Sequence, residues 1–121
     1  MKTLRDATLR ALPIIGPETF LDEAIQELKE EPLRAVALVN EQQYMGMFTE
    51  EDLLPGLIPQ DGDYSTLAVG PYIHPTRVVA EMDSPVEAIL SAALRKGQNL
   101  IPVLNNRIFC GVVTVADLQN L

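Results

Sequence analysis

The chain has 121 residues and a formal net charge of −8, and 47% of its residues are hydrophobic. This length suits one compact module with a buried core. Nine Lys and Arg residues scattered among seventeen Asp and Glu residues form no basic stripe. We therefore expect no binding to nucleic acid, because phosphate backbones require clustered cations. We also expect no membrane association, because no apolar run is long enough to cross a bilayer.

Cysteine usage indicates a reducing compartment. The single cysteine, Cys110, cannot form an internal disulfide, which favours a cytoplasmic location. No neighbouring base activates its thiol, so we expect Cys110 to be a small buried residue of a strand. Met1 leads into a polar stretch without an apolar signal region, and no targeting segment is expected.

The first half of the chain predicts a helix among short strands. An amphipathic lead-in over residues 4–12 precedes a short apolar strand at Ile14 and Ile15. A helix follows, because apolar residues recur on one helical face: Leu21, Ala24, Ile25 and Leu28. Residues 35–39 then predict a strand, and a second strand ends at Phe48. A final helix is expected to begin at Thr49.

The second half repeats this order after a connection rich in proline, glycine and aspartate, which predicts a linker at 59–66. A lead-in over residues 67–73 precedes a short strand at Val78 and Val79. Ser84 as N-cap and Pro85 at the first helical position predict the next helix. Strands at 100–104 and ending at Val113 follow, and the last helix should begin at Thr114. Each hairpin turn carries asparagine, Asn40 or Asn105-Asn106, which tolerates left-handed backbone.

The strongest signal is a motif that occurs twice. GMFTEEDL begins at Gly46 and GVVTVADL begins at Gly111, 65 residues later. The preceding segments 13–31 and 77–96 align with an offset of 64, which places a one-residue insertion near Gly97. A repeat of this length determines the architecture of a small protein.

The predicted fold class is therefore α/β (α+β), with two β-α-β-β-α repeats. Residues 1–58 form the first repeat and residues 67–121 the second. A single repeat would leave one face of its sheet open. We thus expect the two repeats to pack about a pseudo-twofold axis as one module.

The repeated threonine and aspartate suggest a binding site. Thr49 and Thr114 each lie where a strand meets a helix, so the hydroxyl can cap the helix. Asp52 and Asp117, three residues later, can accept two hydrogen bonds from a cis-diol such as that of a ribose. The alternative is a capping box that only starts a helix, and repetition alone does not separate the two interpretations.

The order of elements and both G-h-h-T-x-x-D motifs resemble a tandem pair of CBS domains, a Bateman module. The resemblance covers nearly the whole chain, from about Thr3 to Leu121. It implies that the threonine and aspartate hold the ribose of an adenosine ligand in the cleft between the repeats. By the same resemblance, the base would lie beside Ile14 or Val78. Phosphate would be bound from the positions of Arg34 and Asn99, and Arg77 is a further candidate.

The two motifs differ in charge. Glu50 and Glu51 place two negative charges on the first turn after Thr49, which favours the helix dipole and repels a polyphosphate. Val115 and Ala116 leave the second motif neutral there. The second site is thus expected to suit a charged nucleotide, and the first an uncharged adenosine derivative or nothing. His74, the only histidine, has no partners spaced for a metal site.

These features predict a non-enzymatic regulatory module, because no nucleophile with a matching base and no metal cluster is evident. Its ligand would be AMP, ADP, ATP or an S-adenosylmethionine type of compound, with no cofactor required and an unknown effector protein as partner. A homodimer is expected, with apolar residues near the two motifs as candidate interface: Leu53, Leu54, Leu57, Leu118 and Leu121. The alternative is a structural or dimerisation module whose sites have decayed.

Overall fold

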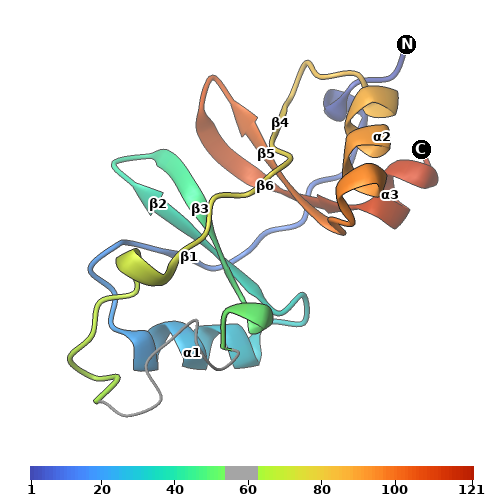
Figure 1. Ribbon diagram of the computed structural model, residues 1–121. Helices are drawn as coiled ribbons and strands as arrows, with labels where there is room; N and C mark the ends of the chain where they lie inside the picture. The colour runs from blue at the N-terminus through green and yellow to red at the C-terminus, as the bar shows by residue number, and fades with distance from the viewer. Residues whose placement is uncertain (54–62) are drawn as a thin grey trace. The chain divides into compact units, whose positions relative to one another are not determined.

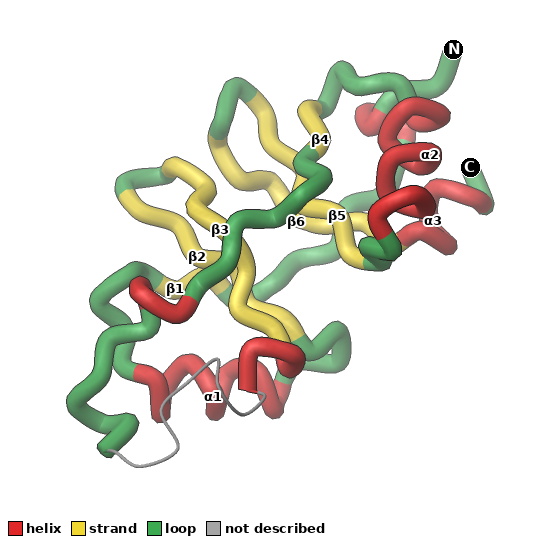
Figure 2. Tube along the Cα trace, viewed as in Figure 1, coloured by secondary structure: helices red, strands yellow, loops and turns green. Residues whose placement is uncertain are grey.

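The computed structural model describes residues 1–53 and 63–121 and divides the chain into two compact units (Figure 1). Residues 12–75 form one unit, here called the inner unit. Residues 1–11 and 76–121 form the other, here called the outer unit, because its sequence flanks that of the inner unit. Each unit is a small sheet with helices, and the expected α/β class is confirmed (Figure 2).

The inner unit contains three strands and one α-helix. Strand β1 (Ile14–Ile15) pairs parallel to β2 (Ala35–Asn40), which pairs antiparallel to β3 (Gln43–Thr49). Helix α1 (Leu21–Glu30) packs on β2 and β3. The apolar face of α1 and the inward side chains of the strands share one core: Ile15, Leu21, Ala24, Leu28, Val36, Leu38, Phe48 and Val69.

The outer unit repeats this arrangement. Strand β4 (Ala80–Glu81) pairs parallel to β5 (Leu100–Asn105), which pairs antiparallel to β6 (Ile108–Thr114). Helices α2 (Val86–Lys96) and α3 (Val115–Gln119) pack against each other. Their buried side chains join one core: Leu4, Val78, Ala80, Val86, Ala93, Ile101, Val103, Val113 and Leu118.

Three short 3₁₀ turns complete the described secondary structure. They are η1 (Leu4–Asp6), η2 (Glu50–Leu53) and η3 (Gly70–Tyr72). The helix expected after Thr49 is thus a 3₁₀ turn as far as residue 53. Most of the predicted linker, 59–62, lies outside the described residues, and residues 63–66 form turns.

The two lead-ins pack on the repeat to which sequence order does not assign them. Residues 1–11 belong to the unit of the second repeat, and residues 67–73 belong to the unit of the first. Leu4 and Val69 are each fully buried in the core of their unit. The carbonyls of Lys2 and Leu67 accept the first N–H of helices α2 and α1, from Val86 and Leu21 respectively. Each lead-in therefore closes the core and caps the helix of its unit.

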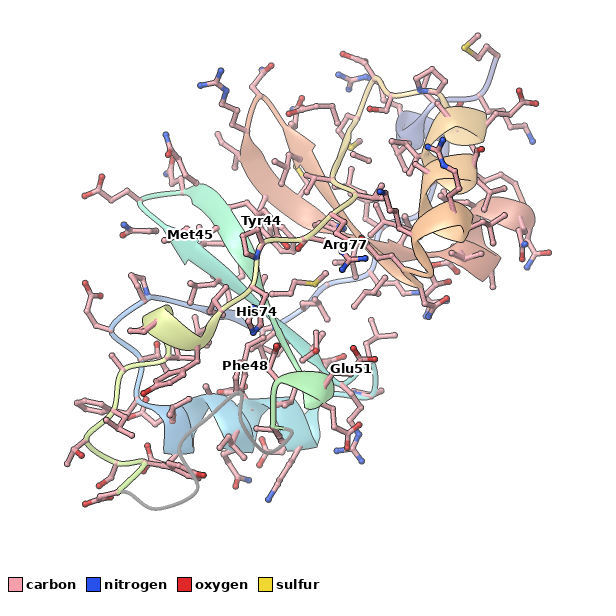
Figure 3. The ribbon with its side chains drawn as sticks, viewed as in Figure 1. Tyr44, Met45, Phe48, Glu51, His74 and Arg77 are labelled. Carbon is pink, nitrogen blue, oxygen red and sulfur yellow. The ribbon has the colours of Figure 1, made fainter. Side chains whose placement is uncertain are left out.

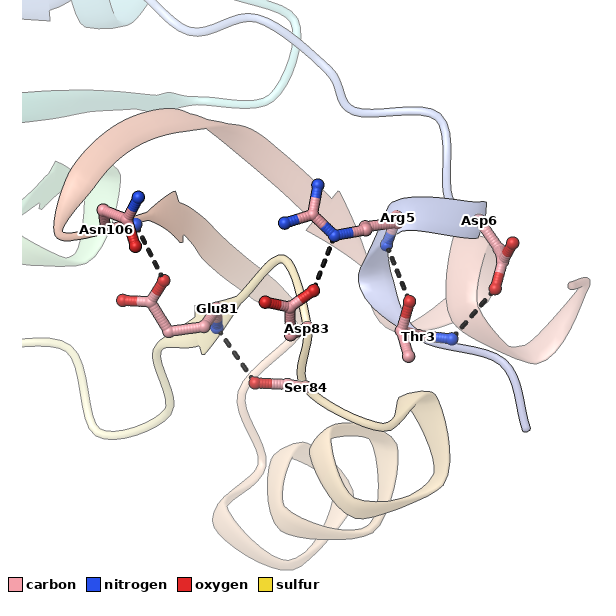
Figure 4. A network of polar contacts seen from close by, with 7 residues as sticks. All are labelled: Thr3, Arg5, Asp6, Glu81, Asp83, Ser84 and Asn106. Atoms are coloured by element: carbon pink, nitrogen blue, oxygen red, sulfur yellow. Dashed lines mark hydrogen bonds and ion pairs between the residues drawn. The ribbon is translucent and has the colours of Figure 1, made fainter.

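These backbone bonds replace the predicted side-chain caps. Helix α2 begins after Pro85, which has no side-chain cap. The Ser84 hydroxyl instead accepts a hydrogen bond from the Glu81 N–H, at 3.0 Å (Figure 4). Thr19 likewise accepts from the Gly16 N–H, at 3.2 Å, and helix α1 begins after Phe20. Both hydroxyls stabilise the turn before the helix, so the Ser84 capping prediction is wrong.

The register of the repeat is 65 residues throughout the strands and helices. Leu21, Ala24 and Leu28 are buried in α1, and residues 65 positions later, Val86, Ile89 and Ala93, face the core from α2. The predicted offset of 64 matched the wrong residues, and there is no insertion near Gly97. For the same reason the short strand β4 begins at Ala80 and not at Val78.

Each hairpin contains a β-bulge directly before the motif glycine. Val103 pairs with Gly111, and Leu104 pairs with Phe109, so Cys110 is left without a partner in the ladder. The same shift leaves Met45 out of the other hairpin. A bulged residue leaves the in-and-out alternation of its strand, and both side chains are exposed. Cys110 is in a strand as predicted, but the prediction that it is buried is wrong.

The tight turns of both hairpins are displaced by one residue from the expected asparagines. Glu41 and Gln42 have left-handed backbone in the inner unit, with φ of 52° and 71°. Asn106 and Arg107 do so in the outer unit, with φ of 53° and 73°. Two successive left-handed residues form the turn that matches strand twist. Only Asn106 takes the predicted role, because Asn40 and Asn105 end strands.

Apolar residues proposed for a dimer interface partly serve the cores. Leu118 is 2% exposed and Leu53 packs against the inner core, whereas Leu121 is exposed. Leu54 and Leu57 lie outside the described residues. No helix in the described ranges combines the length and apolar character needed to cross a membrane. In those ranges, no three His, Cys, Asp or Glu side chains are arranged to hold a metal ion.

Candidate functional site

The motif glycines lie beneath the lead-in segments. Arg10 forms an antiparallel bridge with Val112, and His74 forms one with Met47. A Cβ atom on Gly111 would lie 2.8 Å from the Arg10 carbonyl oxygen, and one on Gly46 would lie 2.9 Å from the His74 carbonyl oxygen. Side-chain atoms do not approach backbone this closely, so only glycine allows the lead-in to pass. The crossing brings one basic residue to each motif.

Thr114 and Asp117 form a complete capping box at the start of α3. The Thr114 hydroxyl accepts a hydrogen bond from the Asp117 N–H at 3.1 Å. The Asp117 Oδ2 atom accepts one from the Thr114 N–H at 3.0 Å. The capping interpretation of the sequence is therefore correct for this motif, and it fixes the carboxylate at the end of β6.

Asp117 also holds Arg10 in a two-point ion pair. Arg10 Nε donates to Oδ2 at 2.8 Å, and Arg10 Nη2 donates to Oδ1 at 2.7 Å. The hydrogen bonds from Arg10 and Thr114 hold the pKa of the Asp117 carboxyl well below its usual range, although burial acts in the opposite direction. The carboxylate in turn raises the pKa of Arg10.

The lowered pKa links this ion pair to stability at acid pH. A carboxyl group with a depressed pKa in the folded state stabilises the fold fully above its unfolded pKa of about 3.9. That contribution is lost as the pH falls through the folded-state pKa of Asp117. At neutral pH the pair is complete, and both carboxylate oxygens of Asp117 are engaged.

Asp52 is held by its threonine in a different way. Its Oδ2 atom accepts from the Thr49 N–H at 2.7 Å and from the Thr49 hydroxyl at 3.3 Å. Its Oδ1 atom lies 3.6 Å from His74 Nε2, which is longer than a hydrogen bond. Only 10% of the Asp52 side chain is exposed, against 57% of the His74 side chain, which is labelled in Figure 3. Asp52 is thus buried without a two-point partner among the described residues.

Replacing the capping hydroxyl should measure what Thr114 contributes to folding. We expect Thr114→Ala to lower the free energy of unfolding by about 1 kcal/mol, because the Asp117 N–H loses its acceptor. Thr114→Ser retains the oxygen and should stay within about 0.5 kcal/mol of the wild type. Urea unfolding followed by circular dichroism gives both values. Equal losses in the two variants would contradict a capping role.

The residues predicted to contact a base differ in exposure. Ile14 is 59% exposed in β1, which leaves it free to meet a ligand. Val78 is 7% exposed and belongs to the outer core, while the Gln98 side chain bonds its backbone N–H and carbonyl. The position 65 residues after Ile14 is Val79, which is 39% exposed. Val79 therefore replaces Val78 as the counterpart of Ile14.

The residues predicted to bind phosphate are all exposed, and their described contacts are structural. Arg34 has left-handed backbone, and its Nη1 atom donates to the Lys29 carbonyl oxygen at 2.9 Å. The Asn99 carbonyl accepts from the Val115 N–H at 2.9 Å, which places its backbone beside the second motif. Arg77 is exposed in the outer unit. Of the three, only Asn99 has a printed contact with a motif segment.

Sequence reasoning missed the two basic residues that the lead-ins deliver. Arg10 is 107 residues from Asp117 in the chain, and His74 had been considered only as a metal ligand. A signal was present, because both lead-ins carry an apolar residue followed by a basic one, Leu9-Arg10 and Ile73-His74. Its meaning depends on which lead-in meets which motif, which the repeat alone does not reveal.

Comparison with known proteins identifies a domain family. A family model described as the CBS domain matches residues 4–58. No curated protein sequence matches the chain. Solved structures do match its fold, and three are similar over nearly the whole of both chains.

The CBS domains of a transcriptional regulator from Streptococcus pneumoniae are 12% identical, with a TM-score of 0.80, and the match covers 100% of this chain and 99% of that one. Hypoxic Response Protein I, solved with two coordinated zinc ions, is 20% identical, with a TM-score of 0.81 and coverage of 99% and 98%. CBSX2 in complex with AMP is 22% identical, with a TM-score of 0.77 and coverage of 98% and 93%.

Proposed function

We propose that this chain, a tandem pair of CBS domains, is a regulatory module that binds an adenosine-containing ligand and passes the binding signal to a partner protein. Such a module changes the balance between conformations by binding one of them more tightly. The ribose would be held by the carboxylate and threonine of a motif, Asp52 with Thr49 or Asp117 with Thr114. The ligand class is AMP, ADP, ATP or an S-adenosylmethionine type of compound.

The observation that supports this proposal is the fixed position of the motif carboxylates. In both units the motif threonine N–H bonds Oδ2 of the aspartate, at 2.7 Å for Asp52 and 3.0 Å for Asp117. A carboxylate fixed at the end of a strand presents its other oxygen in a defined direction, as two-point recognition of a cis-diol requires. The solved relative CBSX2 was crystallised in complex with AMP, which agrees with this ligand class.

A structural or dimerisation module is the second candidate function. It is favoured by the bonds that Asp117 already makes to Arg10 and Thr114, since these satisfy the carboxylate without a ligand. Under this alternative, the motifs serve only to cap helices and anchor lead-ins. The two candidates give different results when nucleosides are added.

Thermal unfolding with adenosine, AMP, ADP, ATP and S-adenosylmethionine tests the sensor function. A ligand at a hundred times its dissociation constant should stabilise the fold by about 2.7 kcal/mol. The shift should disappear with 2′-deoxyadenosine, which lacks one hydroxyl of the diol. Asp52→Ala and Asp117→Ala, measured alone and together, then assign the shift to one motif or both.

Two results would count against the proposal in different ways. If none of the five compounds changes the melting temperature, the sensor function is wrong and the structural module is favoured. If the shift persists in the double aspartate variant, a ligand binds elsewhere on the protein. The Asp83→Ala variant is a matched control, because Asp83 is an exposed aspartate of the outer unit that pairs with Arg5 away from either motif (Figure 4).

A further inference from the structure

The two motif carboxylates differ in how many acceptor positions are free. A carboxylate has about four lone-pair sites, two on each oxygen. At Asp117, Oδ2 accepts from Thr114 N–H and Arg10 Nε, and Oδ1 accepts from Arg10 Nη2. Oδ2 is therefore full, and a diol cannot bond both oxygens while Arg10 is in place.

At Asp52 the same count leaves more room. Oδ1 has no hydrogen bond within the described part of the chain, because His74 Nε2 is 3.6 Å away. One of the two bonds to Oδ2 comes from the Thr49 hydroxyl at 3.3 Å. A hydroxyl rotates freely and can instead accept from a ligand, so its bond is easily exchanged. A diol can therefore reach both oxygens of Asp52 after one hydroxyl rotation.

The guanidinium of Arg10 is a much stronger occupant than the His74 ring. Two parallel charge-assisted hydrogen bonds match the geometry of a carboxylate, and an arginine stays charged at every pH at which the protein folds. A ribose hydroxyl offers only neutral donors in exchange. Displacing Arg10 would also leave the Asp117 carboxylate, 22% exposed, without its cation.

We propose that Arg10 closes the second motif to diols, so that Asp52 is the carboxylate that binds the ribose and the chain takes one adenosine. This inference rests on the proposed function and specifies its site. It reverses the expectation from charge alone, under which the neutral second motif was the better site. Arg10 thus sets the specificity of Asp117 by occupying it.

Calorimetric titration with adenosine tests the closure, because adenosine carries the diol but no phosphate that could interact with Arg10 directly. Wild-type protein should bind one adenosine per chain. Arg10→Met retains the aliphatic stem but removes the guanidinium, and it should bind a second adenosine at least tenfold more tightly than the wild-type second motif does. With 2′-deoxyadenosine, the same variant should gain no site.

Arg5→Met is the matched control. Arg5 lies on the same lead-in and its Nε atom bonds Asp83 at 2.6 Å, but it does not contact the motif (Figure 4). This variant should keep the wild-type stoichiometry of one. A second site gained equally by Arg5→Met would show a general loosening of the lead-in and would overturn the assignment to Arg10.

The outcomes separate this inference from the proposed function. If Arg10→Met gains no adenosine site, or if wild-type protein already binds two, the closure is wrong. If wild-type protein binds none and Arg10→Met binds one that Asp117→Ala removes, the closure is right and the sensor function of the natural chain is wrong. NMR of the wild type is a second test that needs no Arg10 variant. Saturating adenosine should shift the Asp52 side-chain signal and leave the Arg10 Nε–H signal unchanged, and loss of that signal would overturn the closure.

Discussion

Leu4→Ala is expected to lower the free energy of unfolding by about 3 kcal/mol. Leu4 is fully buried, in the core that Val78, Ile101 and Val113 help to form. Its truncation leaves a cavity among side chains of strands β5 and β6, which the remaining lead-in cannot fill. Urea unfolding measures the loss, and Leu94→Ala is the control, because Leu94 is 56% exposed in the same unit and should change stability by less than about 0.5 kcal/mol.

Hydrogen exchange adds a second readout of Leu4→Ala that reports where the loss occurs. Protection of the β5 and β6 amides should fall more than protection of the β2 and β3 amides, because local opening follows the packing of each unit. Greater loss in β2 and β3 would mean that residues 1–11 pack on the first repeat, as sequence order suggests. That result would contradict the exchange of lead-ins.

Gly111→Ala is expected to destabilise the protein by about 3 kcal/mol, from overpacking and from a backbone conformation that L-residues rarely adopt. The new Cβ would lie 2.8 Å from the Arg10 carbonyl oxygen and 3.1 Å from the Leu9 Cβ. The lead-in must therefore move away from the motif. Thermal and urea unfolding give the size of the loss.

The displacement should also disturb the Arg10 ion pair. In Gly111→Ala, the pKa of the Asp117 carboxyl is expected to rise toward its ordinary value, because the hydrogen bonds from Arg10 lengthen. Gly97→Ala is the control for conformation alone, since Gly97 has φ of 65° and open space around it. It should cost about 1 kcal/mol and leave Asp117 unchanged. Equal costs for the two variants would show that the close approach at Gly111 is unimportant.

The fold was predictable because its signals are local and occur twice. Alternation and helical periodicity predict the strands and helices from neighbouring residues, and the two copies confirm each other. The errors arose where a local pattern had more than one solution. The shared letters at Glu23 and Glu87 suggested an offset of 64, whereas burial of Leu21 and Val86 at equivalent helix positions sets it at 65.

The candidate site was predictable in its carboxylates but not in its cations. Thr114 and Asp117 are three residues apart, so the geometry of a helix start relates them. Arg10 reaches Asp117 only because its lead-in packs on the other repeat, and an apolar residue at Leu4 or Val69 suits either core. Amphipathic patterning shows that a segment is buried on one side, but it does not name the surface that buries it.

The exchange of lead-ins has a consequence for synthesis on the ribosome. The first eleven residues emerge before all others, yet their partners lie in 76–121, at the opposite end of the sequence. The continuous inner unit can fold as soon as residue 75 has left the exit tunnel, in keeping with domains folding as units during translation. The N-terminal segment, with Leu4 still in water, must wait until translation is nearly complete. A ribosome-stalled chain ending near residue 75 should therefore hold a folded domain preceded by an unfolded tail.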